Sequence, residues 1–194
     1  FNFGQRPFMF TPPEGYETIA SSNIEPPTIL NPKRHFDCLI WDGNNSASRD
    51  ITGLQFEPDL VWIKNRAQGN THSWQDSIIG FGDDKTLRTD TDGALDTNGN
   101  LYGYINHTLS NGINVNSGTT HGSSRVNSSS SGAKHVAWCW KAGGSTTVTN
   151  NEGSVTSHVS ANTDAGFSIV KWTGNSNSST TIGPVSYTHL RAHE

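Results

Sequence analysis

The stretch that decides the fold is Phe36-Asp37-Cys38-Leu39-Ile40-Trp41-Asp42-Gly43-Asn44, which recurs in outline as Phe167-Ser168-Ile169-Val170-Lys171-Trp172-Thr173-Gly174-Asn175. The offset is constant (167 − 36 = 131), and at the same offset Ile51 falls on Ile182. Phe, Trp, Gly and Asn are shared, and the strand positions between them keep an apolar pattern. Because a repeat of this length indicates one module per copy, the sequence predicts one complete module and the opening of a second.

The composition favours turns and exposed strand faces over helices. Of the 194 residues, 31% are hydrophobic, 15% are charged and 20 are glycines. Ser, Thr and Asn are also abundant, and these residues disfavour helix interiors. The formal net charge of −4 provides no broad field for attracting nucleic acid or an anionic membrane. We therefore expect neither as a partner.

Targeting signals and cysteine content suggest where the chain is made. No apolar run approaches the roughly 20 residues that a membrane helix needs. The first residues lack the basic-then-apolar pattern of a secretion signal. The two cysteines cannot form a disulfide framework. We expect assembly in a reducing cytoplasm, even if the protein later works outside a cell.

Several short apolar segments separated by Asn, Gly and Ser predict an all-β antiparallel sandwich or barrel with no helix. The segment His135-Val-Ala-Trp-Cys-Trp-Lys141 has bulky residues on one parity and small ones on the other. The expected strands cover residues 36–41, 49–56, 59–64, 71–79, 101–105, 112–115 and 135–141.

The same reading gives the expected domain boundaries. Prolines between residues 11 and 34 predict a stiff connector. The complete module is expected at 35–144, and a linker that could hold one hairpin at 145–165. The second copy is expected to open at 166–184.

Both ends of the chain resemble something other than the module. The first eight residues, Phe1-Asn-Phe-Gly-Gln-Arg-Pro-Phe8, resemble the closing strand of SPRY-type β-sandwich domains, so 1–10 is interpreted as the end of a truncated domain; an edge strand of the module is the alternative. The last ten, from Val185 to Glu194, break the composition and resemble a translated sequencing adapter. We interpret 185–194 as a non-native tail.

Two phrases carry a family resemblance: Gly53-Leu-x-Phe56-x-Pro58-Asp59-Leu-Val-Trp-Ile-Lys64-Asn-Arg66 and Ala137-Trp-Cys-Trp-Lys-Ala-Gly143. With the repeated strand, they resemble a tandem domain of unknown function found in virion and tail-fibre-like proteins of tailed phages. The resemblance implies a lectin-like jelly-roll sandwich and a structural or host-contacting role in a virion, with no catalytic residues. It also implies that the partners are other virion proteins, copies of the same chain in a fibre and host-surface glycans.

The tryptophans are the candidate ligand contacts. Five of them lie in apolar strand patterns and are expected to fill the core: Trp41, Trp62, Trp138, Trp140 and Trp172. Trp74 differs, because His72 and Asp76 share its parity. This trio could form an exposed sugar platform; a half-buried strand face is the alternative.

Alternating acidic residues form a second candidate site, for a cation. Asp90, Asp92, Asp96 and Asn98 resemble calcium-loop spacing, because hard cations take several oxygen ligands from one turn. The glycines stand at the wrong offset for a helix-flanked calcium loop, and Asp-Gly and Asn-Gly are also common hairpin turns. The sequence implies no other cofactor.

The leading hypothesis is a non-enzymatic virion protein, part of a tail fibre or similar appendage, acting as a spacer, a host-surface glycan binder or both. A bacterial extracellular carbohydrate-binding or adhesion module is the alternative. A polysaccharide-degrading enzyme would need two carboxylates facing a cleft, and nothing in the spacing indicates such a pair.

Overall fold

The computed structural model describes residues 9–10, 13–15, 27–130 and 132–183. The chain divides into two compact units, Phe1–Leu30 and Asn31–Glu194. The expected SPRY-like strand at 1–8 and the expected non-native tail at 185–194 lie outside the described residues. The fold below is that of the second unit.

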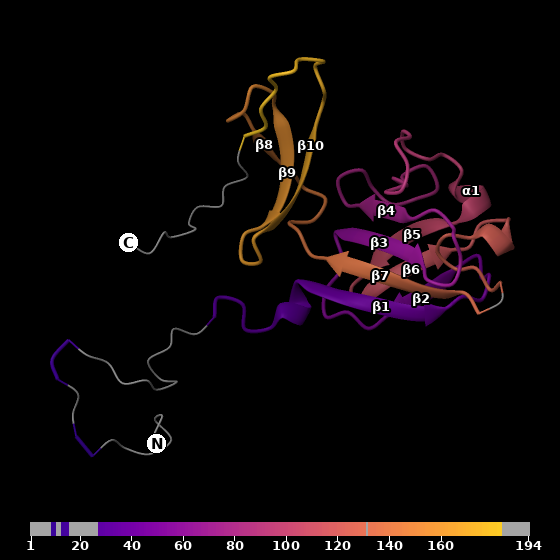
Figure 1. Ribbon diagram of the computed structural model, residues 1–194, viewed down its shortest axis with the longest axis horizontal. Coiled ribbons are helices and arrows are strands. Elements are labelled where there is room, and N and C mark those ends of the chain that lie inside the picture. Colours follow the sequence, from indigo (N-terminus) through magenta and orange to yellow (C-terminus); the bar gives the residue numbers. More distant parts are fainter. Residues whose placement is uncertain (1–8, 11–12, 16–26, 131, 184–194) are drawn as a thin grey trace. The chain divides into compact units, whose positions relative to one another are not determined.

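The first layer of the module is a four-stranded antiparallel sheet in the order β1-β7-β3-β4 (Figure 1). Its strands are β1 (Phe36–Asp42), β7 (Lys134–Trp140), β3 (Leu60–Asn65) and β4 (Ser73–Asp76). The repeated stretch thus forms an edge strand, and it pairs with β7 in a register that sets Phe36 opposite Trp140. The first and last strands of the module are therefore neighbours.

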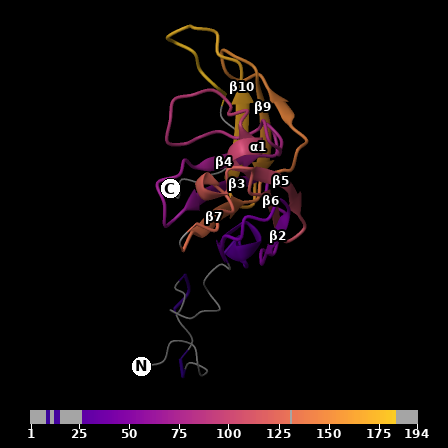
Figure 2. The same cartoon turned by 90° about the vertical axis from the view of Figure 1, so that its right-hand side faces the viewer.

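The second layer is a three-stranded antiparallel sheet in the order β2-β6-β5 (Figure 2). Its strands are β2 (Arg49–Thr52), β6 (Gly112–Asn116) and β5 (Tyr104–Leu109), with a register shift between Ile105 and His107. Strands make up 38% of the structure and helices 6%. The prediction of an all-β antiparallel sandwich is confirmed, while the jelly-roll connectivity stays a prediction.

Within the described residues, helix is confined to single turns. The 3₁₀ turns are η2 (Pro32–Arg34) and η3 (His121–Ser123), and α1 (Gly99–Tyr102) is a four-residue α-helix. The expectation of no helix was wrong at α1, which occupies the start of the strand expected at 101–105. This turn ends at Gly103, whose φ of 87° lies in the left-handed region that glycine adopts readily.

The core lies between the two sheets and consists mostly of aliphatic side chains. Val61 and Ile63 of β3 and Ala137 and Cys139 of β7 are fully buried. The other members come from both sheets and their loops: Leu39, Trp41, Ile51, Leu54, Phe56, Ile105, Ile113, Val115 and Val126. Strand β7 contributes the small residues Ala137 and Cys139 to this core, and the facing sheet contributes branched aliphatic side chains that fill the space beside them.

The expectation that tryptophans fill the core was wrong for four of the five. Only Trp41 is buried; its Nε1 donates to the Val126 carbonyl at 3.1 Å. Trp62, Trp138 and Trp140 are half-buried, and Trp172 is 48% exposed. On β3 and β7 the core takes the other parity, so the indole rings lie on the outer face of the sheet.

A separate three-stranded sheet, in the order β10-β9-β8, follows the sandwich in the sequence. It consists of β8 (Val148–Asn150), β9 (Ser157–Asn162) and β10 (Phe167–Trp172). The segment 145–165, which was expected to be a linker that could hold one hairpin, contains the antiparallel strands β8 and β9. β10 carries the stretch whose sequence resembles that of β1, yet it pairs with β9, whereas β1 pairs with β7.

Candidate functional site

The outer face of the four-stranded sheet carries a row of aromatic side chains. The strand registers place Trp138 of β7, Trp62 of β3 and Trp74 of β4 side by side across three neighbouring strands. The ring centroids of Trp62 and Trp138 are 4.9 Å apart, and those of Trp62 and Trp74 are 6.4 Å apart. Cross-strand neighbours at these distances touch one another, so the three indoles form one continuous surface.

Two further aromatic groups flank this row. His72 lies beside Trp62, with ring centroids 5.8 Å apart. Next along β7, Trp140 lies 5.0 Å from Phe36. We call this surface, made of Phe36, His72, Trp62, Trp74, Trp138 and Trp140, the tryptophan face.

Strand alternation explains why these rings share one side. Successive residues of a strand point to opposite faces, so burying Ala137 and Cys139 commits Trp138 and Trp140 to the outer face. On β3 the buried Val61 and Ile63 do the same for Trp62. Each ring covers part of its neighbours, which leaves the three tryptophans half-buried.

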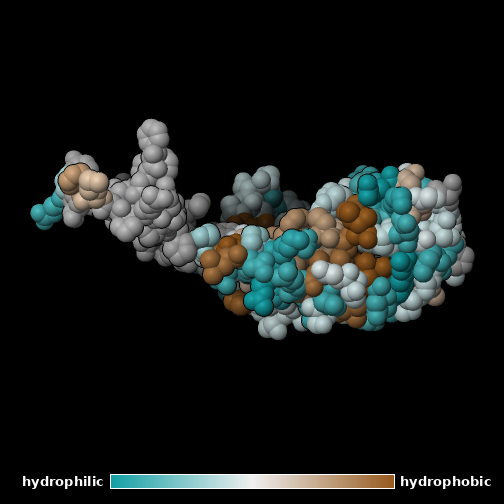
Figure 3. Space-filling view, turned by 90° about the horizontal axis from the view of Figure 1, so that it is seen from below, coloured by the Kyte–Doolittle hydropathy of each residue, from teal (hydrophilic) through white to brown (hydrophobic). Residues whose placement is uncertain are grey.

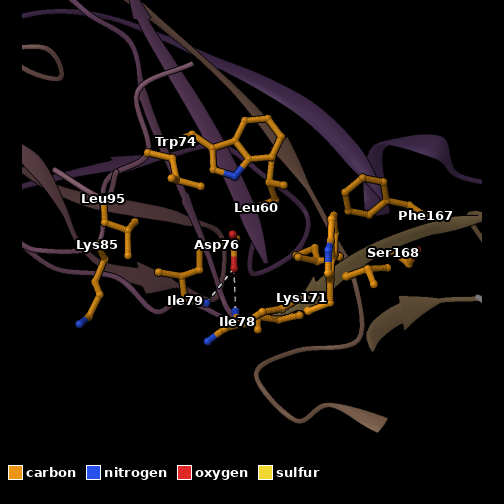
Figure 4. A pocket seen from close by; sticks show the side chains of 14 residues that line it. Leu60, Trp74, Asp76, Ile78, Ile79, Lys85, Leu95, Phe167, Ser168 and Lys171 are labelled. Atoms are coloured by element: carbon orange, nitrogen blue, oxygen red, sulfur yellow. Dashed lines mark hydrogen bonds between the residues drawn. The ribbon is translucent and has the colours of Figure 1, made fainter. Parts of the chain in front are cut away.

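A groove adjoins the Trp74 end of this face (Figure 4). Its volume is about 660 Å³, and β10 forms one wall. The lining is mostly apolar, with lysines among it: Leu60, Trp74, Asp76, Ile78, Ile79, Lys85, Leu87, Leu95, Phe167, Ser168, Ile169, Val170, Lys171 and Trp172. A half-open apolar groove beside aromatic rings is the ordinary form of a ligand site.

Asp76, which shares this groove, has a structural role. Its Oδ1 accepts hydrogen bonds from the backbone N–H groups of Ile78 and Ile79, both at 2.9 Å, and the residue is 3% exposed (Figure 4). Those two donors would otherwise be unsatisfied in the turn after β4. Asp76 is the one acidic residue among the described residues that line the groove.

The structure separates the predicted trio of His72, Trp74 and Asp76. Trp74 lies in the aromatic row, as its parity requires. His72 lies against Trp62, and its Nδ1 is 3.0 Å from the Thr89 hydroxyl. The aromatic ring that contacts both Trp74 and His72 is that of Trp62.

The predicted cation residues are divided in a similar way. Asp90 and Asp92 are exposed, and Asp90 accepts a long hydrogen bond from the His72 backbone N–H at 3.4 Å. Asp96 is 5% exposed and forms an ion pair with Arg125, while its Oδ1 accepts two hydrogen bonds from Asn98. Burial alone would raise the pKa of the Asp96 carboxyl, but the Asn98 hydrogen bonds and the Arg125 charge bring it below its ordinary value. Among the described residues, no group of three or more His, Cys, Asp or Glu side chains is placed to hold a metal ion.

Sequence reasoning missed the tryptophan face because it assigned Trp138 and Trp140, the bulky alternate residues of β7, to the core. The signal was present in the same strand. Ala137 and Cys139 alternate with Trp138 and Trp140, and an indole is seldom buried completely. A wholly buried row of rings would also have required far more space between the sheets than their usual separation of about 10 Å allows.

Comparison with known proteins gives a family but no function. The family model described as a domain of unknown function, DUF7483, matches residues 31–188. The chain belongs to the DUF7483 family. The DUF7483 match begins where the second compact unit begins, and it runs past β10 into the segment that we interpreted as non-native. No curated protein and no solved structure matches this DUF7483 chain. In the described part of the chain, no helix is long and apolar enough to cross a membrane.

Proposed function

We propose that this DUF7483 chain is a component of a phage tail fibre or similar virion appendage, and that it binds host-surface glycans on its tryptophan face. The observation that carries the binding role is the row of Trp138, Trp62 and Trp74 on the outer side of the sheet. The virion role rests on the resemblance to tail-fibre-like proteins, with their tandem modules and SPRY-like neighbour.

The chemistry of the face suits a sugar ring. Pyranose rings present flat C–H surfaces, and half-buried indoles offer apolar planes that are rigid before binding. Immobilising them therefore costs little entropy. A ring resting on Trp62 and Trp74 would also be within reach of polar groups at the edge, such as His72 and Lys64. Aromatic planes with a few convergent polar groups are the usual composition of such sites.

Shallow sites of this type bind weakly one at a time. A fibre that presents many copies converts weak contacts into firm attachment, because each later contact is intramolecular. The repeated opening of β1 in β10 fits a module that is copied along a chain, and we propose a homo-oligomeric fibre on that ground. A host-surface role places the mature protein on the virion, after assembly in the host cytoplasm.

The binding role is tested with the whole chain on a glycan array, followed by calorimetry with the best glycan. We expect Trp62→Ala and Trp138→Ala each to weaken binding at least tenfold, about 1.4 kcal/mol. Tyr104→Ala is the matched control, because Tyr104 is a half-buried aromatic residue on the other sheet. Thermal unfolding of each variant separates lost binding from lost structure. If no glycan binds, or if Trp62→Ala and Tyr104→Ala bind equally well, the binding role is refuted.

The virion role is tested separately. Mass spectrometry of purified phage virions from the natural source of this chain should find it among the appendage proteins. Detection in bacterial cell-wall fractions and absence from virions would favour the bacterial adhesion module instead. The tryptophan face could bind glycans in either a phage appendage or a bacterial adhesion module.

A further inference from the structure

A second pocket, separate from the groove, lies beside the tryptophan face and contains two arginines. Its volume is about 340 Å³, and Arg88, Arg125, Tyr102, Thr71 and Ser123 line it. Thr71 immediately precedes His72, which lies against Trp62. The pocket and the tryptophan face are therefore neighbours along the β3–β4 loop.

Arg125 is the unusual member of this pocket, because its side chain is only 2% exposed. Its Nη2 donates to the Asp96 carboxylate, and its guanidinium carbon lies 5.2 Å from the Tyr102 ring centre. Its Nε and Nη1 are buried and have no hydrogen-bond partner within the described residues. Buried donors are nearly always satisfied in native proteins, so two free donors on one buried cation indicate a missing acceptor.

The charge of the cluster points to an anion. Arg88 lies 3.7 Å from Asp96 through its Nε, which also has no hydrogen-bond partner among the described residues. One buried carboxylate thus faces two guanidinium groups, which leaves the cluster with one uncompensated positive charge. A single carboxylate supplied by a ligand would balance that charge and accept charge-assisted hydrogen bonds from the free donors.

We propose that this pocket binds the carboxylate of an acidic sugar, so that the glycan held by the tryptophan face is an anionic polysaccharide. The inference rests on the proposed function and names its ligand class. Neighbouring sugars would lie along the aromatic row from Trp62 toward Trp74. The hydroxyls of Thr71, Ser123 and Tyr102 would hydrogen-bond the rest of the acidic ring.

The experiment compares two probes with the same sugar rings, one anionic and one neutral. Oligogalacturonate carries free carboxylates, and its methyl ester keeps the same rings but is neutral. Calorimetry with the whole chain at constant ionic strength should show at least tenfold tighter binding of oligogalacturonate. Arg88→Gln should abolish that preference while neutral binding persists, and Arg34→Gln, at an exposed arginine, should preserve it. Arg88 is the better position to change, because its side chain is 34% exposed, whereas a variant of buried Arg125 could fail to fold.

The outcomes distinguish failure of the carboxylate pocket from failure of glycan binding on the tryptophan face. Equal binding of the two probes overturns the acidic-sugar pocket and leaves glycan binding intact. If neither oligosaccharide binds, the arginine pocket is tested alone by measuring the thermal unfolding midpoint of the chain with and without free galacturonate. If galacturonate raises the midpoint and Arg88→Gln abolishes that rise, the carboxylate pocket is supported and glycan binding on the tryptophan face is refuted. If the midpoint does not rise, both proposals are overturned. A sulfated neutral oligosaccharide bound as tightly as oligogalacturonate would refute the carboxylate and indicate a sulfate site.

Discussion

Phe36 and Phe167, which hold the same position in the two similar stretches of sequence, lie against the same ring. Their centroids are 5.0 Å and 6.1 Å from that of Trp140, at interplanar angles of 47° and 17°. Beside them, Asn162 donates to the Lys141 carbonyl at 3.1 Å, and the Gly143 N–H donates to the Ser160 hydroxyl at 2.9 Å. Strand β10 is therefore joined to β7, the last strand of the sandwich.

This junction predicts the effect of removing Phe167. Phe167→Ala removes the stacked pair with Trp140, which contributes about 1 kcal/mol beyond simple burial. We expect faster amide hydrogen exchange in β9 and β10 and unchanged exchange in β5 and β6. Phe36→Ala is the comparison, because it should loosen β1 instead. Unchanged exchange in β9 and β10 would show that the stacked ring does not hold the third sheet.

The repeat supplies a matched pair of glycines for a stability test. A Cβ added at Gly43 would lie 1.6 Å from the Ser128 carbonyl oxygen, whereas one added at Gly174 meets nothing within 4 Å. Gly43→Ala must therefore displace backbone, and we expect it to lower the free energy of unfolding by about 2–3 kcal/mol. Gly174→Ala should change it by less than about 0.5 kcal/mol. Urea unfolding of both variants measures this, and equal effects would contradict the close packing at Gly43.

His135 predicts a loss of stability in mild acid. The residue is fully buried and stacks on Trp41, with ring centroids 5.4 Å apart. Burial, aided by the charge of Arg49, lowers its pKa from 6.5 to about 4. As the pH falls, His135 is protonated in the unfolded chain before it is protonated in the folded chain. The contribution of the neutral imidazole to stability is therefore complete above pH 6.5 and is lost as the pH falls toward 4.

A pKa shift of this size lowers the free energy of unfolding by roughly 3 kcal/mol between pH 7 and pH 4. Urea unfolding across that range should show a steeper loss for the native chain than for His135→Gln. His107→Gln, at an exposed histidine, should keep the native slope. Because the comparison uses slopes, a uniformly weaker His135→Gln variant remains informative, and identical slopes would exclude His135 as the cause.

The two cysteines predict a difference in thiol reactivity. They lie on neighbouring strands but on opposite faces of the sheet, where Cys38 is exposed and Cys139 is buried among core residues. Burial raises the pKa of both thiols, and the larger effect is on Cys139. We expect a disulfide exchange reagent to modify one thiol per folded chain and two after denaturation. Cys38→Ser should leave no thiol reactive in the folded state, and persistent reaction would contradict the burial of Cys139.

Part of the ligand surface could have been found from the sequence. The alternation in β7 required small and bulky residues on opposite faces, and the parity of Trp74 with His72 and Asp76 was recognisable. The alternation in β7 favours an outward tryptophan face but does not by itself fix which face of β7 is buried, because that also depends on the bulk supplied by the opposite sheet. Ile105, Ile113 and Val115 of the opposite sheet share the core with Ala137 and Cys139, the small residues of β7.

The arginine pocket was hidden for a different reason. Arg88 and Arg125 are 37 residues apart (125 − 88), and no local spacing relates them. Asp96 was noticed for its position in an alternating acidic run. Its actual partner, Arg125, lies within the serine-rich segment 123–132 that precedes β7, where an isolated arginine carries no signal.

The sequence by itself determined the strand content, the antiparallel sandwich and the repeated opening, because turn residues and apolar runs act over a few neighbouring positions. Tertiary structure alone decided which side of each strand is buried and which distant charges meet. It also decided that the repeated strand pairs with β9 while its first copy pairs with β7. Those outcomes depend on how two layers fill a shared volume, and that volume is a property of the whole module rather than of any one segment.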